Sequence, residues 1–236
     1  MDKKYIIEES VIMNFIQLSL ESEQMSSTWT GTLKQFGRNT CIVPSSQYTY
    51  LLFTDGRLMG MFNFGQRIYP FSEDPLKKPS FFQRKKIRQA EVVCISNGFK
   101  FCLNWGISYM KIDDKTNQFY DVSMSGRLYV EIGQLLDQVL AFYQRVVLNG
   151  PSVIEKEYFG NKIKPIILSY VPELFDQFLA EKNISLEKCI DMTPSEIMYM
   201  SQWMCKKVRD ELSLLGISIS PAFESVFLNI VSIKKR

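Results

Sequence analysis

The chain has no histidine among its 236 residues, and this absence excludes several kinds of site. A Ser–His–Asp or Cys–His nucleophilic site cannot be assembled, no imidazole can act as a general base, and mixed Cys/His zinc sites are ruled out. Catalysis by this chain would have to use carboxylates, lysines, tyrosines or a bound metal.

Motifs for phosphate and metal binding are missing as well. No segment has the G-x-G-x-x-G or P-loop spacing, no calcium-binding D-x-D-x-D-G loop occurs, and the cysteines form no C-x-x-C pair. The adjacent acids Asp113 and Asp114 belong to a polar segment, where solvation is the ordinary role of a carboxylate. The sequence therefore predicts no cofactor, no metal site and no catalytic residues.

Neither sign of charge dominates, and long apolar runs are absent. The 28 Lys+Arg and 25 Asp+Glu residues leave a net charge of +3, too small to define a nucleic-acid-binding protein by composition. No stretch reaches the roughly 20 apolar residues of a membrane-spanning helix. The apolar segment 11–20 does not fit a signal peptide, because Glu8 and Glu9 precede it. We therefore expect an intracellular, cytoplasmic protein.

The five cysteines are an odd number and are scattered along the chain. Hydrophobic residues make up 46% of the sequence, so a packed core does not depend on disulfides. We expect buried, reduced thiols. A disulfide between Cys94 and Cys102, which flank a predicted turn, is the alternative.

Apolar runs in the first half of the chain predict antiparallel strands. Residues 41–53 and 58–64 are separated by Asp55-Gly56, a pair that tolerates the positive φ angles of a hairpin turn. The proline-containing residues 69–79 predict a loop.

A second hairpin is predicted farther along the chain. Residues 91–96 form its first strand, Asn97-Gly98 its turn, and the strict alternation over residues 99–107 its second strand. Another alternating strand is predicted over residues 122–132.

The pattern then changes to a helical period. Apolar residues at three- and four-residue steps predict an amphipathic helix over residues 132–147. A capping box at Ser152 and Glu155 is predicted to begin a second helical region, with a kink or a break at Pro165 and Pro172.

The third predicted helix has the clearest boundaries. Thr193 is expected to cap it, Glu196 to complete a capping box, and Gly216 to stop it. Strands are predicted to return at residues 217–219 and 223–233.

This order of elements predicts an α+β protein with mostly antiparallel pairing. We expect a β-rich first subdomain over residues 1–112. In the second subdomain, residues 113–236, a smaller sheet should pack with two to three amphipathic helices.

A cluster of positive charge interrupts the balanced composition. It comprises Lys77, Lys78, Arg84, Lys85, Lys86 and Arg88, with Phe81 and Phe82 among them. One interpretation is a surface that contacts anionic lipid head groups or nucleic acid, with the phenylalanines inserting or stacking. The alternative is a solvated loop whose phenylalanines belong to the core, since short basic runs are common on surfaces.

Several motifs together resemble a known family. They are Val43-Pro44-Ser45-Ser46-Gln47-Tyr48-Thr49-Tyr50, Thr54-Asp55-Gly56-Arg57, Phe64-Gly65-Gln66-Arg67-Ile68-Tyr69, Glu91-Val92-Val93, Trp105-Gly106 and Ser125-Gly126-Arg127-Leu128-Tyr129-Val130-Glu131-Ile132. In this order and spacing they are similar to the stomatin/prohibitin/flotillin (SPFH) family, in its soluble bacterial virion core protein-like branch. The likeness spans residues 39–233, with Asn63-Phe64-Gly65-Gln66 standing where the family has Gly-Pro-Gly.

The resemblance implies a non-enzymatic SPFH-like scaffold that forms homo-oligomers and organises protein or membrane-associated assemblies. Its partners would be further copies of the chain and other proteins, with peripheral contact to an anionic membrane, while nucleic acid is disfavoured. Binding of an anionic membrane or of nucleic acid through residues 77–88 is the alternative function. A carboxylate- or metal-dependent enzyme is a third function, which the absence of histidine disfavours.

Overall fold

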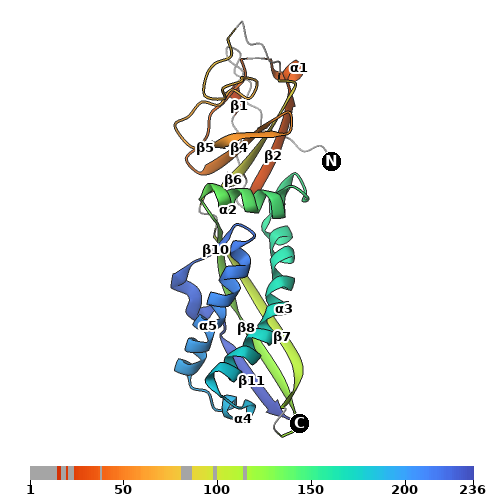
Figure 1. Cartoon of the computed structure of the whole chain (residues 1–236), viewed down its shortest axis with the longest axis vertical. Helices are drawn as coiled ribbons and strands as arrows, with labels where there is room; N and C mark the ends of the chain where they lie inside the picture. The colour runs from red at the N-terminus through yellow and green to blue at the C-terminus, as the bar shows by residue number, and fades with distance from the viewer. Residues whose placement is uncertain are drawn as a thin grey trace. The chain divides into compact units, whose positions relative to one another are not determined.

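The computed structural model describes residues 15–16, 20, 24–37, 39–80, 87–97, 100–113 and 116–236 (Figure 1). The chain forms two compact units: unit 1 comprises Met1–Phe99 and Val147–Lys156, and unit 2 comprises Lys100–Val146 and Glu157–Arg236. The boundary predicted at residues 112/113 lies inside unit 2, because the units separate between Phe99 and Lys100. Antiparallel sheets combined with helices confirm the predicted α+β class.

The described part of unit 1 is built on an antiparallel sheet. Its strands lie in the order β5 (Arg57–Phe62), β4 (Tyr48–Thr54), β6 (Gln89–Ser96), β2 (Gln24–Thr32) and β9 (Val153–Glu155). All neighbours in this order pair antiparallel. The short helix α1 (Leu33–Phe36) follows β2, and β1 (Phe15–Ile16) pairs in parallel with β3 (Cys41–Ile42).

The hairpin predicted at Asp55-Gly56 is confirmed as the connection between β4 and β5. Both residues have positive φ, 46° at Asp55 and 78° at Gly56. Asp55 Oδ1 also accepts hydrogen bonds of 3.1 Å from the backbone N–H groups of Arg88 and Gln89. The turn is therefore fastened to the start of β6, the next strand of the sheet.

The core of unit 1 packs against this sheet. Its buried residues come from the strands and from the loop between β5 and β6: Trp29, Ile42, Tyr50, Leu52, Phe62, Ile68, Phe71, Ile87, Ala90, Val92 and Cys94. The loop predicted over residues 69–79 is confirmed, and it contributes Phe71, which is 1% exposed. Burial of these aromatic and aliphatic side chains is the main term that stabilises the unit.

The sheet of unit 2 has the long strand β8 at its centre. β8 (Gln118–Ile132) pairs on one side with β7 (Lys100–Asp113) and on the other with β10 (Ile217–Ile219) and β11 (Ile230–Lys235), always antiparallel. The hairpin predicted over residues 91–107 is wrong, because β6 pairs with β4 and β2 whereas β7 pairs with β8. The alternating strand predicted over residues 122–132 is confirmed, and the one predicted over residues 99–107 is confirmed from Lys100 onward, since Phe99 lies outside the described residues.

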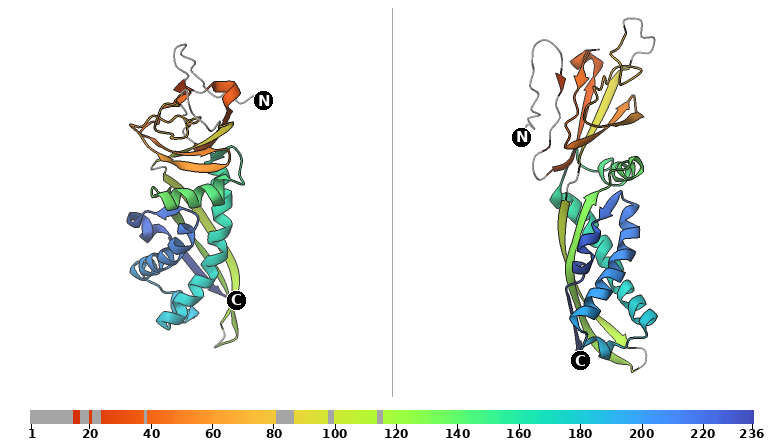
Figure 2. Two further views of the ribbon diagram at one scale, coloured as in Figure 1. Left: turned by 45° about the horizontal axis from the view of Figure 1, so that its top comes forward. Right: turned by 90° about the vertical axis from the view of Figure 1, so that its left-hand side faces the viewer.

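Helices cover one face of the sheet of unit 2 and leave the opposite face, called here the open face, exposed (Figure 2). They are α2 (Leu136–Phe142), which continues as a π-helix (Tyr143–Val147), α3 (Lys156–Lys182), α4 (Leu186–Cys189), α5 (Pro194–Ser213) and the 3-10 helix η2 (Pro221–Val226). The burial of β8 alternates accordingly, with Val122, Met124 and Leu128 buried on the covered face. Within the described residues, no helix combines the length and apolar character needed to cross a membrane.

Several predicted helix limits are wrong. The helix predicted over residues 132–147 begins only at Leu136, because Ile132 is the last residue of β8. Ser152 and Glu155 do not cap a helix, since Val153–Glu155 is strand β9 and α3 begins at Lys156. Of the kink or break predicted at Pro165 and Pro172, the break does not occur, because α3 is continuous through both prolines. A proline inside a helix costs about 3 kcal/mol, which burial of one apolar face offsets along α3.

The third predicted helix is confirmed as α5. Thr193 Oγ1 accepts a 3.3 Å hydrogen bond from the Glu196 backbone N–H, and the Thr193 N–H donates to Glu196 Oε2 at 2.8 Å. Gly216, with φ 72°, follows its C-terminus. The strand predicted over residues 223–233 is corrected, because η2 extends to Val226 and β11 begins only at Ile230.

Candidate interaction surface

Strand β7 forms one margin of the sheet of unit 2, as Figure 1 shows. It pairs with β8 without interruption, from Lys100 opposite Glu131 to Asp113 opposite Gln118. On its other edge it pairs with no strand among the described residues. An edge strand of 14 residues is long compared with the usual five or six, so it presents an extended row of backbone N–H and C=O groups.

The odd-numbered residues of β7 anchor the strand to the helices. Trp105 is 3% exposed, and its ring centroid lies 5.1 Å from that of Phe227. The rings of Phe101 and Phe159 of α3 pack edge to face, with their centroids 5.9 Å apart. The absence of a Cβ at Gly160 leaves room for the Phe101 ring. The covered face of β7 is therefore tightly held, which fixes the position of its outer edge.

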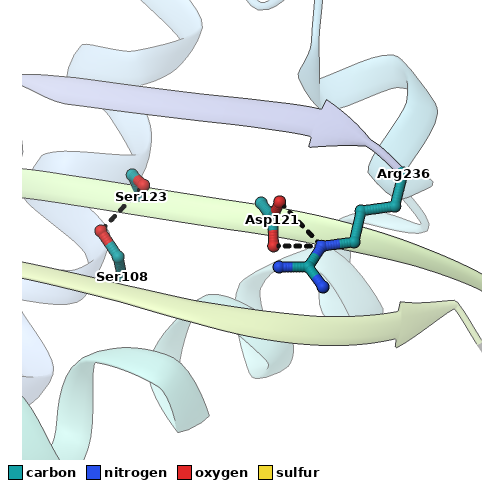
Figure 3. A network of polar contacts seen from close by, with 4 residues as sticks. All are labelled: Ser108, Asp121, Ser123 and Arg236. Carbon is teal, nitrogen blue, oxygen red and sulfur yellow. Dashed lines mark hydrogen bonds and ion pairs between the residues drawn. The ribbon is translucent and has the colours of Figure 1, made fainter.

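A polar network covers part of the open face (Figure 3). The hydroxyl groups of Ser108 on β7 and Ser123 on β8 are hydrogen bonded at 2.9 Å. The Nε of Arg236 contacts both carboxylate oxygens of Asp121 at 2.9 Å, and this ion pair raises the pKa of Arg236. These cross-strand contacts join β7, β8 and β11 on a solvent-exposed surface.

Apolar side chains are exposed at the far end of the β7–β8 hairpin. Met110, Ile112 and Phe119 have exposed fractions of 54%, 46% and 44%, and Ile112 lies directly opposite Phe119. Met110 and Ile112 lie on β7 beside its outer edge, whereas Phe119 lies on β8. A neighbouring molecule at this edge would cover Met110 and Ile112.

The edge of β7 carries few of the features that normally block pairing with other strands. It contains no proline, and its register with β8 has no bulge. Lys111, near the C-terminal end of β7, is not free to protect the edge, because its Nζ is bound to Asp176 Oδ1 of α3 at 2.6 Å. The arrangement is therefore suited to accepting a further strand.

A small cavity of about 160 Å³ lies beside this ion pair. Its polar lining comes from the end of β7, from α3 and from the segment joining α3 to α4: Lys111, Asp113, Asp176, Asn183 and Ser185. Burial, and to a smaller extent the charge of Asp176, raise the pKa of the neighbouring Tyr109 hydroxyl. Because Lys111 neutralises Asp176, these groups primarily tie β7 to α3.

The predicted basic segment is only partly described. Phe81, Phe82, Arg84, Lys85 and Lys86 lie outside the described residues. Lys77, Lys78 and Arg88 belong to unit 1 and are exposed. Lys77 Nζ lies 3.0 Å from Asp74 Oδ2, and the hydrogen bond from Lys77 lowers the pKa of Asp74. Binding of anionic lipid or nucleic acid by this segment stays a prediction.

All the cysteines are free thiols, and they differ in accessibility. Cys41, Cys94, Cys189 and Cys205 are buried, whereas Cys102 is exposed on β7. Cys94 lies in unit 1 and Cys102 in unit 2, on strands that do not pair, so they form no cross-hairpin disulfide.

No cluster of three or more Cys, Asp or Glu side chains suited to one metal ion occurs in the part of the chain that the structure describes. A scan against protein-family models found no family that matches the chain, and a search of curated proteins found no match. The outer edge of β7, with the exposed apolar residues beside it, is thus the candidate site on the grounds of geometry alone.

Proposed function

We propose that this chain is a non-enzymatic scaffold whose copies associate through the outer edge of β7. The observation that carries the proposal is the length of this edge, which runs from Lys100 to Asp113 and pairs with no other strand of the described residues. Addition of a strand there would satisfy the backbone groups of the edge and cover Met110 and Ile112.

The resemblance of the sequence to the SPFH family supports the same proposal. The resemblance implies a self-associating scaffold, and an unprotected edge strand is a physical means of self-association. In this function the chain would organise other proteins, or assemblies at a membrane, by bringing several copies together.

Sedimentation velocity over a concentration series tests the proposal. We expect the average mass of the wild-type chain to rise from monomer towards oligomer as the concentration increases. Asn104→Lys places a charge on the exposed face of β7, and we expect it to shift this equilibrium towards monomer.

A matched control is Ser232→Lys, which places the same charge on the open face but on β11, at the opposite side of β8. We expect this variant to associate like the wild type. A wild-type chain that remains monomeric at high micromolar concentration would contradict the proposed function.

A further inference from the structure

We propose that two copies of the chain pair their β7 strands antiparallel, about a two-fold axis at Gly106, to form one continuous sheet. This inference rests on the proposed function, and it specifies which surface of the second copy is used and in which register. The starting point is that β8 already occupies one edge of β7. Two copies that pair through β7 must therefore use the same outer edge, so that the contact is isologous.

The alternation of β7 determines how the two strands face each other. Trp105 and Leu103 are 3% and 8% exposed on the covered face, whereas Cys102, Asn104 and Gly106 are exposed. Directly opposed residues in a sheet lie on the same face. A two-fold axis perpendicular to the sheet keeps apolar residues beside apolar ones and makes the strands antiparallel. An axis lying in the plane of the sheet would instead place apolar residues beside exposed polar ones.

The choice of register follows from this restriction. When both faces match, two opposed residues are both even-numbered or both odd-numbered, so their residue numbers add up to an even sum. Sums of 212 and 214 give the longest overlap between residues 100–113 of the two copies. A sum of 214 would place Leu103 opposite Lys111 and Asn104 opposite Met110, so that polar–apolar mismatches reach the interior of the strand. A sum of 212 instead gives the pairs Cys102–Met110, Leu103–Tyr109, Asn104–Ser108 and Trp105–Ile107, with Gly106 opposite Gly106 of the second copy. Each of these pairs is apolar with apolar or polar with polar, so the strand complements itself about Gly106.

The charges of β7 agree with the same register. Lys100 would lie opposite Ile112, and Lys111 opposite Phe101, so no like charges are directly opposed. Lys111 is also bound to Asp176 of its own copy. The pairing therefore buries no uncompensated repulsion between lysines.

Gly106 allows the axis to be tested directly. A Cβ at this position would lie 3.6 Å from the Cβ of Ser125, an ordinary contact, so a side chain is tolerated within one copy. In Gly106→Lys, or in Gly106→Glu, two like charges would face each other across the axis. We expect each variant alone to weaken self-association at least about tenfold, and an equimolar mixture of the two to restore it.

Cys102 supplies an independent measure of the register, since it is the exposed thiol and the other four are buried. Each Cys102 would lie four residues from the axis, so the two positions are eight strand steps, about 27 Å, apart. Pulsed electron–electron double resonance on the full chain, spin-labelled at Cys102, should show this separation in the oligomer. Sedimentation velocity on the same labelled sample establishes whether the oligomer is present.

The outcomes separate the inference from the function on which it rests. Restoration by the mixture together with a separation of about 27 Å supports the two-fold pairing. An oligomer with a different Cys102 separation, or one that neither charged variant weakens, overturns the pairing and leaves self-association standing. Cross-linking of Cys102 to Cys102 at close range would indicate a parallel in-register contact and would also overturn it. A chain that stays monomeric overturns both.

Discussion

The main chain at Phe227 lies so close to Gly126 that a Cβ at position 126 would collide with the Phe227 carbonyl group. Gly126 is an interior residue of β8 and lies opposite Trp105, whose ring packs against the ring of Phe227. The absence of a side chain at Gly126 thus allows the segment between η2 and β11 to cross directly over the covered face of the sheet. No flexible side chain is available there to move aside.

Gly126→Ala should therefore destabilise the protein strongly. The backbone of residues 227 and 228 would have to shift, and overpacking of this kind costs about 1–3 kcal/mol, with the rigid backbone favouring the upper end. Urea unfolding followed by circular dichroism measures the change. Gly106→Ala on the neighbouring strand is the matched control, because its Cβ would make only ordinary contacts, and it should stay within about 0.5 kcal/mol of the wild type. Equal effects of the two substitutions would contradict this explanation.

The carboxylate of Asp55 should stabilise unit 1 through its two hydrogen bonds to the backbone at Arg88 and Gln89. Asp55→Gly removes the carboxylate and tolerates the φ of 46°, so these bonds are lost without straining the turn; the added glycine also raises the entropy of the unfolded chain. We expect a loss of about 1–2 kcal/mol in the free energy of unfolding. Asp55→Asn keeps an acceptor oxygen and tolerates positive φ, and it should recover most of this loss. If Asp55→Gly is as stable as the wild type, the bonds do not contribute.

Patterns confined to neighbouring residues predicted much of the fold. The Asp55-Gly56 turn, the alternation in β7 and the capping of α5 at Thr193 are each determined within a few residues, and each is confirmed. The sequence also identified β6 and β7 as strands. It could not show that β6 and β7 pair with other strands and not with each other, because pairing depends on competition between distant partners.

Other features could not be predicted for the same physical reason. β2 has the polar sequence QMSSTWTGT, yet it lies inside the sheet because β6 and β9 bond to its two edges. Its neighbour β9 is separated from it by more than a hundred residues in the chain. The free outer edge of β7 likewise could not be predicted from local patterns, because a strand is at the edge of a sheet only when no distant strand pairs with it. The basic segment, in contrast, was found from composition, although the structure describes only part of it.

Ser201 is a further residue whose role appears only in the structure. Its side chain is buried in α5, where Oγ donates to the Glu224 carbonyl group at 2.7 Å and accepts from the Leu228 N–H at 2.9 Å. Ser201→Ala would leave both backbone groups without this partner, and we expect a loss of about 1–3 kcal/mol in urea unfolding. Ser213→Ala is the control, since this exposed hydroxyl donates to the Asp210 carbonyl group in the same helix and should matter little. A difference of zero between the variants would refute the assigned role.

The buried thiols should make the protein less stable at alkaline pH. Burial raises the pKa of Cys205 and that of Cys189 to about 11, from 9.0. Because the folded state holds these protons more tightly, their contribution is complete below pH 9 and is lost as the pH rises through about 11. Between pH 9 and pH 11, each thiol should lower the free energy of unfolding by about 1.4 kcal/mol per pH unit. Cys189→Ala should therefore reduce the slope measured by urea unfolding between pH 9 and pH 11; an unchanged slope would contradict the assignment.

The ion pair of Lys77 with Asp74 gives a specific test of the predicted basic segment. The two groups lie 3.0 Å apart, so Asp74 offsets part of the charge that Lys77 could offer to an anionic surface. Lys78 is exposed and adjacent in the chain. If the segment binds anionic vesicles, each effective lysine contributes about 1 kcal/mol, roughly a fivefold change in the partition coefficient.

We therefore expect Lys78→Gln to weaken sedimentation with anionic vesicles more than Lys77→Gln does. Lys85→Glu together with Lys86→Glu should weaken it most, since this change reverses two charges at once, and added salt should reduce binding of every variant. Neutral vesicles provide the control for insertion driven by apolar side chains alone. Equal binding of the wild type to neutral and anionic vesicles, or binding that the double reversal leaves unchanged, would show that the positive charge of this segment does not direct the protein to a membrane.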